Sequence, residues 1–123
     1  MDDDLKLLAN LYDRFNARDV DGVLTALTED VAWANAMEGG HVHGREAVRA
    51  YWTRQWALVS PQVEPVSFRR ATDGAVVAEV RQTIRDLDGK PLQGQTHGLE
   101  DKTVEHVFRL RDGKVARFDV QEA

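Results

Sequence analysis

The segment from Ala75 to Leu87, with the sequence AVVAEVRQTIRDL, limits the kinds of fold that the chain can adopt. Apolar and polar side chains alternate along it, which is the pattern of a strand with one buried face. The residues on one face are mainly apolar: Val76, Ala78, Val80, Gln82 and Ile84. The residues on the other face are mainly polar: Val77, Glu79, Arg81, Thr83 and Arg85. The segment therefore predicts a long strand that packs one face on a core.

Asp–Gly pairs, which favour tight turns, separate further strands in the second half of the chain. They occur at residues 73–74, 88–89 and 112–113. Residues 89–101 are rich in glycine and polar side chains, so we expect a long loop or a short irregular strand there. The predicted antiparallel strands are residues 65–70, 75–87, 104–111 and 115–120. In the last strand, three apolar residues should share one face: Ala116, Phe118 and Val120.

The first half of the chain has a helical period instead. Apolar residues recur at spacings of three and four from Leu5 to Phe15, which predicts a helix over roughly residues 3–17. Asp19 can cap a second, short helix. The expected buried residues of that helix are Val20, Val23, Leu24 and Leu27. A third helix should begin at Gly44 and end at residues 60–61, because a residue that precedes proline disfavours helical geometry.

Two segments of the first half do not follow this period. Residues 31–33 indicate an extended segment that we expect to join the sheet, and residues 38–44, EGGHVHG, indicate a loop. Helices in one block and strands in another predict an α+β fold, with the helices on one face of the sheet. A length of 123 residues suits one domain and is too short for two, so we expect a single domain over residues 1–123.

Composition argues against several classes of function. The chain is 42% hydrophobic and 30% charged, which indicates a folded core. Its net charge of −5 argues against binding to nucleic acid, whose partners are normally basic. It has no cysteine, so disulfides and thiolate metal sites are excluded. No apolar run approaches ~18 residues and the acidic start lacks the pattern of a signal peptide, so we expect no membrane contact and a cytoplasmic location.

Four motifs resemble a known family. They are FNARDVDG at 15–22, LTEDVAW at 27–33, GREAV at 44–48 and FRLRDGKV at 108–115. Together they resemble the nuclear transport factor two-like superfamily, in its SnoaL-like and ketosteroid-isomerase-like branch. The resemblance implies three helices packed in a strongly curved, mainly antiparallel sheet, a cone-shaped barrel with an internal pocket. It does not imply one activity, since such proteins include isomerases, cyclases, epoxide hydrolases, dehydratases and non-enzymatic domains.

The residues of the isomerases in this branch can be compared position by position. Leu11 stands where they have a tyrosine, and Asn35 stands where they have the aspartate base. An amide cannot accept a proton at neutral pH. His106 stands at the position of their neutral acid, and Trp52 at that of a tyrosine in the third helix. Tyr12 is about 100° from Leu11 around the helix, so we do not expect it to replace the missing tyrosine. We therefore expect no ketosteroid isomerase activity.

His106 and Gln82 each interrupt an apolar strand face. An imidazole in a pocket can act as a general acid or base, which makes His106 the candidate catalytic residue. The alternative is a core histidine bonded to a neighbour. Gln82 needs a hydrogen-bond partner if it is buried, and that partner can be a ligand, His106 or the surrounding structure. Adjacent antiparallel strands should bring the two side chains within reach of each other or of one ligand.

Aromatic residues are the expected walls of the pocket. We select Trp33, Trp52 and Phe118 as ligand-contacting residues, with Asn35 as a further amide close to Trp33. A row of aromatic side chains on a helix is also what a plain core requires, and Asn35 can equally bond the backbone.

The histidines near the predicted loops invite a metal-site interpretation. A His-x-His pair such as His41 and His43 directs both rings to one side of a strand, as in some zinc sites. However, His41, His43, His97 and Glu38 lie in glycine-rich loops, and no third ligand has a defining spacing. We therefore predict no metal and no cofactor, and expect residues 38–44 to form the lip of the pocket.

The outer faces of the predicted strands carry opposite charges around Val77 and Val107. In proteins that resemble this one, such a face is often a dimer interface, and we predict a homodimer through it. A solvated face held by cross-strand ion pairs is the alternative. Asp119 also falls on the outer face, which argues against a role as a base.

Two functions remain open at this point. The first is binding of a small apolar or weakly polar molecule with cofactor-free isomerase, cyclase or hydratase chemistry, in which His106 acts as acid or base and Gln82 and Asn35 orient the ligand. The second is a non-catalytic ligand-binding or accessory dimeric domain.

Overall fold

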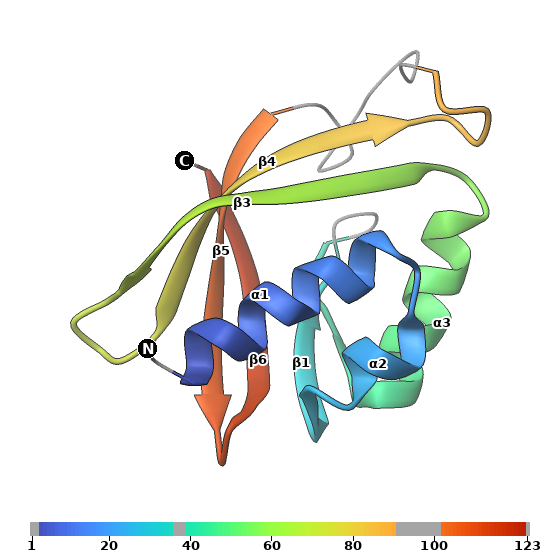
Figure 1. Ribbon diagram of the computed structural model, residues 1–123. Coiled ribbons are helices and arrows are strands. Elements are labelled where there is room, and N and C mark those ends of the chain that lie inside the picture. The colour runs from blue at the N-terminus through green and yellow to red at the C-terminus, as the bar shows by residue number, and fades with distance from the viewer. Residues whose placement is uncertain (1–2, 36–38, 91–101, 123) are drawn as a thin grey trace.

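The computed structural model of the chain describes residues 3–35, 39–90 and 102–122 (Figure 1). The helices are α1 (Asp3–Asn16), α2 (Val20–Leu24) and α3 (Arg45–Trp56). The strands are β1 (Leu27–Ala34), β2 (His41–His43), β3 (Ser60–Arg70), β4 (Val76–Arg85), β5 (Lys102–Arg111) and β6 (Lys114–Glu122).

Within the described residues, the strands form one six-stranded sheet with the order β2-β1-β6-β5-β4-β3. β1 pairs with β6 in parallel, and the other neighbouring pairs are antiparallel. The sheet curves around α1, which lies across its inner face, while α3 packs against β1 and β2 (Figure 1). β2 and β3 stay at opposite edges of the order, so the sheet is not closed. The predicted α+β fold is confirmed, with an open curved sheet in place of a full barrel.

The first helix forms as its apolar spacing predicts. Its buried residues are Leu8, Leu11, Tyr12 and Phe15. Arg18 follows the helix with φ 62°, a left-handed conformation that ends helical geometry. The side chain of Asn16 then takes the place of a strand partner for Val63. Its Nδ2 donates to the carbonyl of Val63 at 2.7 Å, and its Oδ1 accepts from the amide of Val63 at 3.0 Å. These two hydrogen bonds anchor the end of α1 to β3.

The second helix is capped by Asp19 as expected, because the Asp19 carboxylate accepts from the amide of Gly22 at 3.0 Å. The prediction that Leu27 belongs to this helix was wrong. α2 ends at Leu24, and Leu27 begins β1, where it pairs with Val115 of β6. Leu27 is fully buried in the strand. An apolar residue would be expected at a buried position of a helix as well, so its apolar character alone could not distinguish the two.

Other boundaries also differ from the prediction. α3 ends at Trp56, before the expected end at residues 60–61. His41–His43 is not a loop but the short strand β2, which pairs antiparallel with β1. β3 begins at Ser60, five residues earlier than expected, although it includes Pro61 and Pro65. Proline cannot donate a ladder hydrogen bond and is therefore tolerated mainly in edge strands. β3 is such an edge, which explains why prolines did not exclude a strand here.

Register shifts interrupt the alternation of side chains in β1, β3 and β6. In β3, Pro65 pairs with Val80 and Ser67 with Glu79, which leaves Val66 as the extra residue. In β6 the register shifts in the same way around Ala116. The expectation that Ala116 shares the inner face with Phe118 was wrong, because Val115 occupies that face and is fully buried while Ala116 is half-buried. Bulges bend and twist a strand, which contributes to the curvature of the sheet.

The core fills the space between the inner face of the sheet and the helices. Trp33 and Phe108 are both buried in it. Across the residues that the structure describes, no helix has the length and apolar character needed to span a membrane.

Candidate functional site: an aromatic cavity with a tyrosine–histidine pair

A cavity of about 70 Å³ lies between α1, α3 and the inner face of the sheet. Most of its lining is apolar or aromatic: Leu11, Tyr12, Phe15, Trp33, Ala34, Tyr51, Trp52, Gln55, Pro61, Val63, Gln82, Ile84, His106, Phe108, Phe118 and Val120. Val120 is 40% exposed, so the cavity reaches the surface beside the end of β6. No lining residue in the described part of the chain carries a formal charge when its histidine is neutral.

The structure places five of the six selected site residues in this lining. They are His106, Trp33, Trp52, Gln82 and Phe118. Asn35 is not among the lining residues. Its amide donates to the carbonyl of Gly40 and its carbonyl accepts from the amide of Gly39, both at 2.9 Å, so its backbone closes the turn after β1. Contact of these side chains with a ligand remains a prediction.

One wall of the cavity is a stack of aromatic rings. Trp33 and Phe118 are paired neighbours on the parallel strands β1 and β6, and their rings stack at 4.1 Å between centroids with planes 20° apart. Trp52 reaches from α3 and meets Trp33 edge-on at 5.2 Å. These arrangements are favourable for aromatic pairs. The resulting wall is aromatic and apolar, which suits an apolar ligand.

The polar centre of the cavity is a pair that the sequence did not predict. The hydroxyl of Tyr12 lies 2.7 Å from Nδ1 of His106, and the two rings stack with planes 10° apart. The comparison by position gave Tyr12 no role in the pocket, yet it lines the cavity together with Leu11. Leu11 and Tyr12 are about 100° apart around the helix, so a flat sheet could contact only one of them. Because the sheet curves around α1, it encloses both residues.

Burial keeps both members of this pair uncharged. It lowers the pKa of His106 from its ordinary 6.5 to about 3, because the low-dielectric surroundings disfavour the imidazolium. Burial also raises the pKa of the Tyr12 hydroxyl well above its ordinary value. At neutral pH the cavity therefore holds a neutral imidazole bonded to a neutral phenol.

Gln82 and His106 line the same cavity but at different depths. His106 pairs with Ala78 across β4 and β5, whereas Gln82 pairs with Lys102. The two side chains are thus four residues apart along the strands, about 13 Å at the usual rise. Of the two possibilities that the sequence left open, this register disfavours direct contact of the two side chains, and contact of both with one ligand stays a prediction.

Sequence reasoning did not select Tyr12, Tyr51 or Gln55 as site residues. The amide nitrogen of Gln55 donates to the Tyr51 hydroxyl at 3.0 Å, one turn away on α3. Gln55 could have been selected because it is a polar residue on an apolar helix face, just as His106 is a polar residue on an apolar strand face. Tyr12 was harder to select, because a buried tyrosine also fits an ordinary core.

The family can be identified at this point. A family model of the SnoaL-like domain matches residues 8–118. The chain belongs to this family. The resemblance that the four sequence motifs indicated is therefore confirmed. The open curved sheet is the form that the SnoaL-like fold takes in this chain.

Solved structures share the fold of this SnoaL-like chain at low sequence identity. An NTF2-like protein of unknown function from Burkholderia pseudomallei K96243 is 22% identical, with a TM-score of 0.81 over 100% of this chain and 92% of that one. TerC, co-crystallised with polyporic acid, is 19% identical, with a TM-score of 0.80 over 99% and 92%. A candidate polyketide cyclase from Silicibacter sp. TM1040 is 24% identical, with a TM-score of 0.74 over 98% and 88%. No curated protein matches the sequence significantly.

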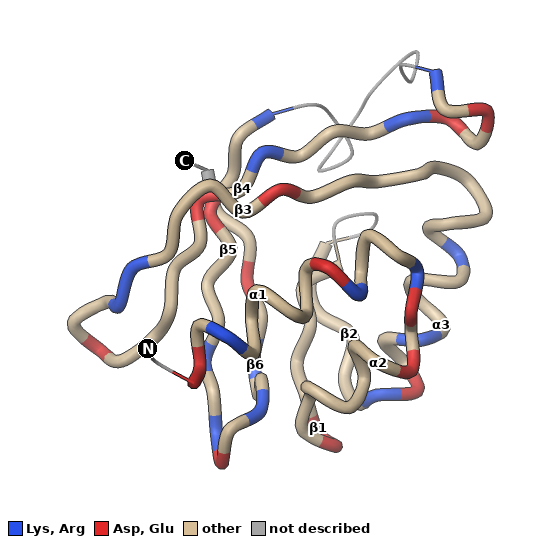
Figure 2. The backbone as a smooth tube through the Cα atoms, in the orientation of Figure 1, with Lys and Arg blue, Asp and Glu red and all other residues tan. Residues whose placement is uncertain are grey.

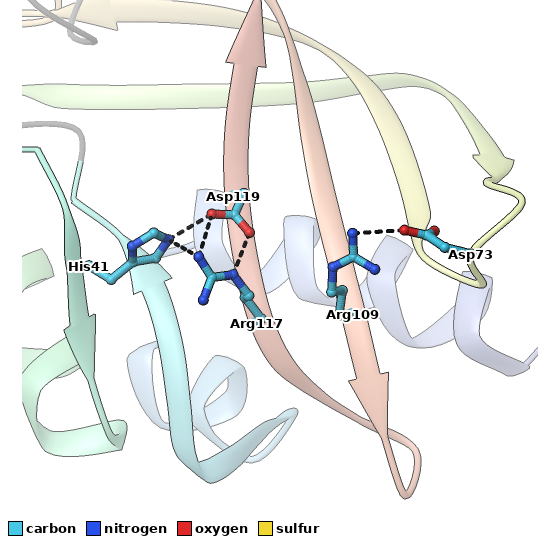
Figure 3. Close-up of polar contacts among 5 residues, drawn as sticks. All are labelled: His41, Asp73, Arg109, Arg117 and Asp119. Carbon is cyan, nitrogen blue, oxygen red and sulfur yellow. Dashed lines mark hydrogen bonds and ion pairs between the residues drawn. The ribbon is translucent and has the colours of Figure 1, made fainter.

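The outer face of the sheet in this SnoaL-like chain holds a second histidine. Nε2 of His41 lies 2.7 Å from Oδ1 of Asp119, and Nε of Arg117 donates to Oδ2 of Asp119 at 2.8 Å. Figure 3 shows this cluster on β2 and β6, with the helices on the far side of the sheet. Partial burial raises the pKa of Asp119, but the hydrogen bonds from Arg117 and His41 outweigh it and the pKa is lowered. Asp119 is therefore a paired carboxylate on the outer face, where a cavity ligand does not reach it.

The same face provides little support for a metal site. In the described ranges, no three His, Asp or Glu side chains gather closely enough to hold a metal ion. His97 and Glu38 lie outside the described residues, so that part of the metal interpretation is not addressed. In the described part of the chain, acidic and basic residues occur on helices, strands and turns (Figure 2).

Proposed function

We propose that this SnoaL-like domain binds a small, uncharged, mainly apolar molecule in the aromatic cavity, with His106 as its polar contact. The observation that carries the proposal is a histidine, 5% exposed, set in an otherwise aromatic lining. An apolar cavity gains affinity from the area that it removes from water, and a single polar group fixes the orientation of the ligand. A charged ligand would lose its hydration without a charged partner among the described lining residues.

A second candidate function is cofactor-free chemistry on the bound molecule, of the isomerase, cyclase or hydratase type. A general base works best when its pKa is near the working pH, and a pKa of about 3 makes His106 a weak base at pH 7. A neutral imidazole can instead donate a hydrogen bond to a carbonyl oxygen and polarise it. This observation favours a polarising role over proton abstraction for His106 if the domain is an enzyme.

Ligand titration followed by ¹H–¹⁵N NMR tests the binding proposal. Acetophenone, which is flat, neutral and carries one acceptor oxygen, is the probe. We expect the largest shifts at the indole N–H groups of Trp33 and Trp52, which line the cavity. His106→Phe should weaken binding, whereas His43→Phe, a control at the exposed end of β2, should not. Shifts centred on the outer face, or none at millimolar probe, contradict the proposal.

We also propose that two chains associate through the outer face of the sheet, as the sequence predicts. Val107 is half-buried within its own chain, and both signs of charge surround it. Val77 is 5% exposed, so it adds less apolar surface to such an interface than its sequence position suggested. Neutralised ion pairs around Val107 support a self-complementary contact with a second copy of the chain.

A further inference from the structure

The bond between Tyr12 and His106 has a direction that the surrounding groups determine. In the described part of the chain, Nδ1 of His106 is the hydrogen-bond partner of the Tyr12 hydroxyl, and Nε2 of His106 has no protein partner. Both side chains line the cavity. A neutral imidazole carries one proton, on either Nδ1 or Nε2, and the partner of the other nitrogen decides between the two.

The two possible arrangements leave different numbers of unsatisfied groups. If Nδ1–H donated to the phenol oxygen, the Tyr12 proton and the bare Nε2 would both face the cavity without a protein partner. If Tyr12 O–H donates to a bare Nδ1, only Nε2–H is left over. A phenol is also a stronger hydrogen-bond donor than a neutral imidazole, and a bare imidazole nitrogen is a stronger acceptor than a phenol oxygen. Unsatisfied buried polar groups are costly, so the second arrangement is favoured.

We infer that Tyr12 is a positioning residue that holds the proton of His106 on Nε2, so that the cavity presents a hydrogen-bond donor and selects ligands with a carbonyl-type acceptor oxygen. This inference rests on the proposed binding function and specifies the ligand class for the same site. It also separates the two tyrosines of the lining, because the Tyr51 hydroxyl accepts from Gln55 whereas the Tyr12 hydroxyl meets His106.

The stacked geometry supports the inference independently of the hydrogen bond. The Tyr12 and His106 rings are nearly parallel, and the Phe118 ring meets His106 edge-on at 4.8 Å. These contacts leave the imidazole little freedom to turn over, which would swap Nδ1 with Cδ2 and Nε2 with Cε1. The donor is therefore fixed in place before a ligand arrives, which lowers the entropic cost of binding.

The ¹⁵N chemical shifts of the histidine ring test the protonation site without any ligand. In the wild-type protein, His106 is expected to give the pattern of a neutral ring with its proton on Nε2, assigned by its loss in His106→Phe. Tyr12→Phe should mix the two neutral forms, while the matched variant Tyr51→Phe should leave His106 unchanged. A proton on Nδ1, an imidazolium at pH 7, or an unchanged pattern in Tyr12→Phe overturns the inference.

A pair of isosteric probes tests the selectivity. Acetophenone and α-methylstyrene differ only in an oxygen that replaces a CH₂ group. We expect the wild-type protein to favour acetophenone by about threefold to tenfold, the value of one net hydrogen bond. The preference should fall in Tyr12→Phe, vanish in His106→Phe and persist in Tyr51→Phe.

The possible outcomes separate the two proposals. Equal affinity for both probes in the wild-type protein overturns the donor inference but leaves ligand binding intact. Failure of both probes to bind contradicts the proposed function, and in that case the ring ¹⁵N shifts still decide the protonation site.

Discussion

The two faces of the sheet use histidine in opposite ways. His106, on the inner face, is enclosed by aromatic rings and bonded to a neutral phenol. His41, on the outer face, is bonded to a carboxylate that an arginine also contacts. The same side chain is thus a neutral donor inside and part of an ionic network outside. This difference teaches that the environment on each face of the sheet, and not the residue type, decides which histidine can serve a ligand.

The largest expected effect that separates the two faces is on stability. Phe118→Ala should lower the free energy of unfolding by about 3–5 kcal/mol, the usual cost of emptying an aromatic core position. Arg117 is the neighbouring residue of β6 and its side chain lies on the outer face (Figure 3). Arg117→Ala should lower the free energy of unfolding by at most about 1 kcal/mol, because Arg117 is solvent-exposed. Urea denaturation of both variants measures the difference. Equal losses would show that the ring stack does not hold the fold.

A pH titration of stability tests the burial of His106. The pKa of His106 is lowered to about 3 in the folded state, whereas the unfolded chain binds its proton near pH 6.5. The unfolded state therefore gains protons first, and stability should fall as the pH decreases from 6.5 toward 3. Between pH 6.5 and 5, where most carboxylates are still ionised, the loss from His106 is about 2 kcal/mol. His106→Phe should remove this part of the slope, and a slope identical to that of the wild type would contradict a buried neutral imidazole.

Light scattering tests the outer face as an interface between two chains. At micromolar concentration we expect a dimer mass for the wild-type protein. Val107→Glu and Val107→Lys should both shift it toward the monomer, because either charge is buried at the contact. Val107 lies opposite Asp119 across β5 and β6, so the lysine variant controls for repulsion between this pair within one chain. A monomer mass for the unmodified chain would reject the interface.

The smallest expected effect concerns the ion cluster of the outer face. Asp119→Asn removes the charge that His41 and Arg117 share. Pairs that are this exposed contribute between about 0.2 and 1 kcal/mol and weaken in salt. The loss of stability should therefore shrink between low and high salt. A loss that exceeds 2 kcal/mol and does not depend on salt would mean that the cluster is more than a surface network.

The fold was predictable from the sequence where side-chain period was unambiguous. The alternation in β4 and β5 and the apolar spacing of α1 fixed the helix and strand types and the inner faces. The errors fall where the period is short or broken. Leu27 stands between a helix and a strand, and the three residues of β2 are too few to show alternation. At Ala116, the bulge reverses the alternation without leaving a sign in the residue types.

The candidate site was predictable only in part for a related reason. Strand alternation placed His106, Gln82 and Phe118 on the inner face, and the family resemblance placed Trp52 in the pocket. Neither source gave the distance between Gln82 and His106, which depends on the register of β4 against β5. The Tyr12–His106 bond joins residues 94 positions apart and depends on how far the sheet curves around α1. Such a contact is set by tertiary packing, which a single sequence does not show.

Native mass spectrometry of the freshly purified protein tests most directly whether the inner face is the functional one. The account predicts that the wild-type chain retains a small neutral molecule, that Asp119→Asn on the outer face retains it as well, and that His106→Phe on the inner face releases it. A bare chain mass for the wild-type protein, or retention by His106→Phe together with loss in Asp119→Asn, would contradict the account.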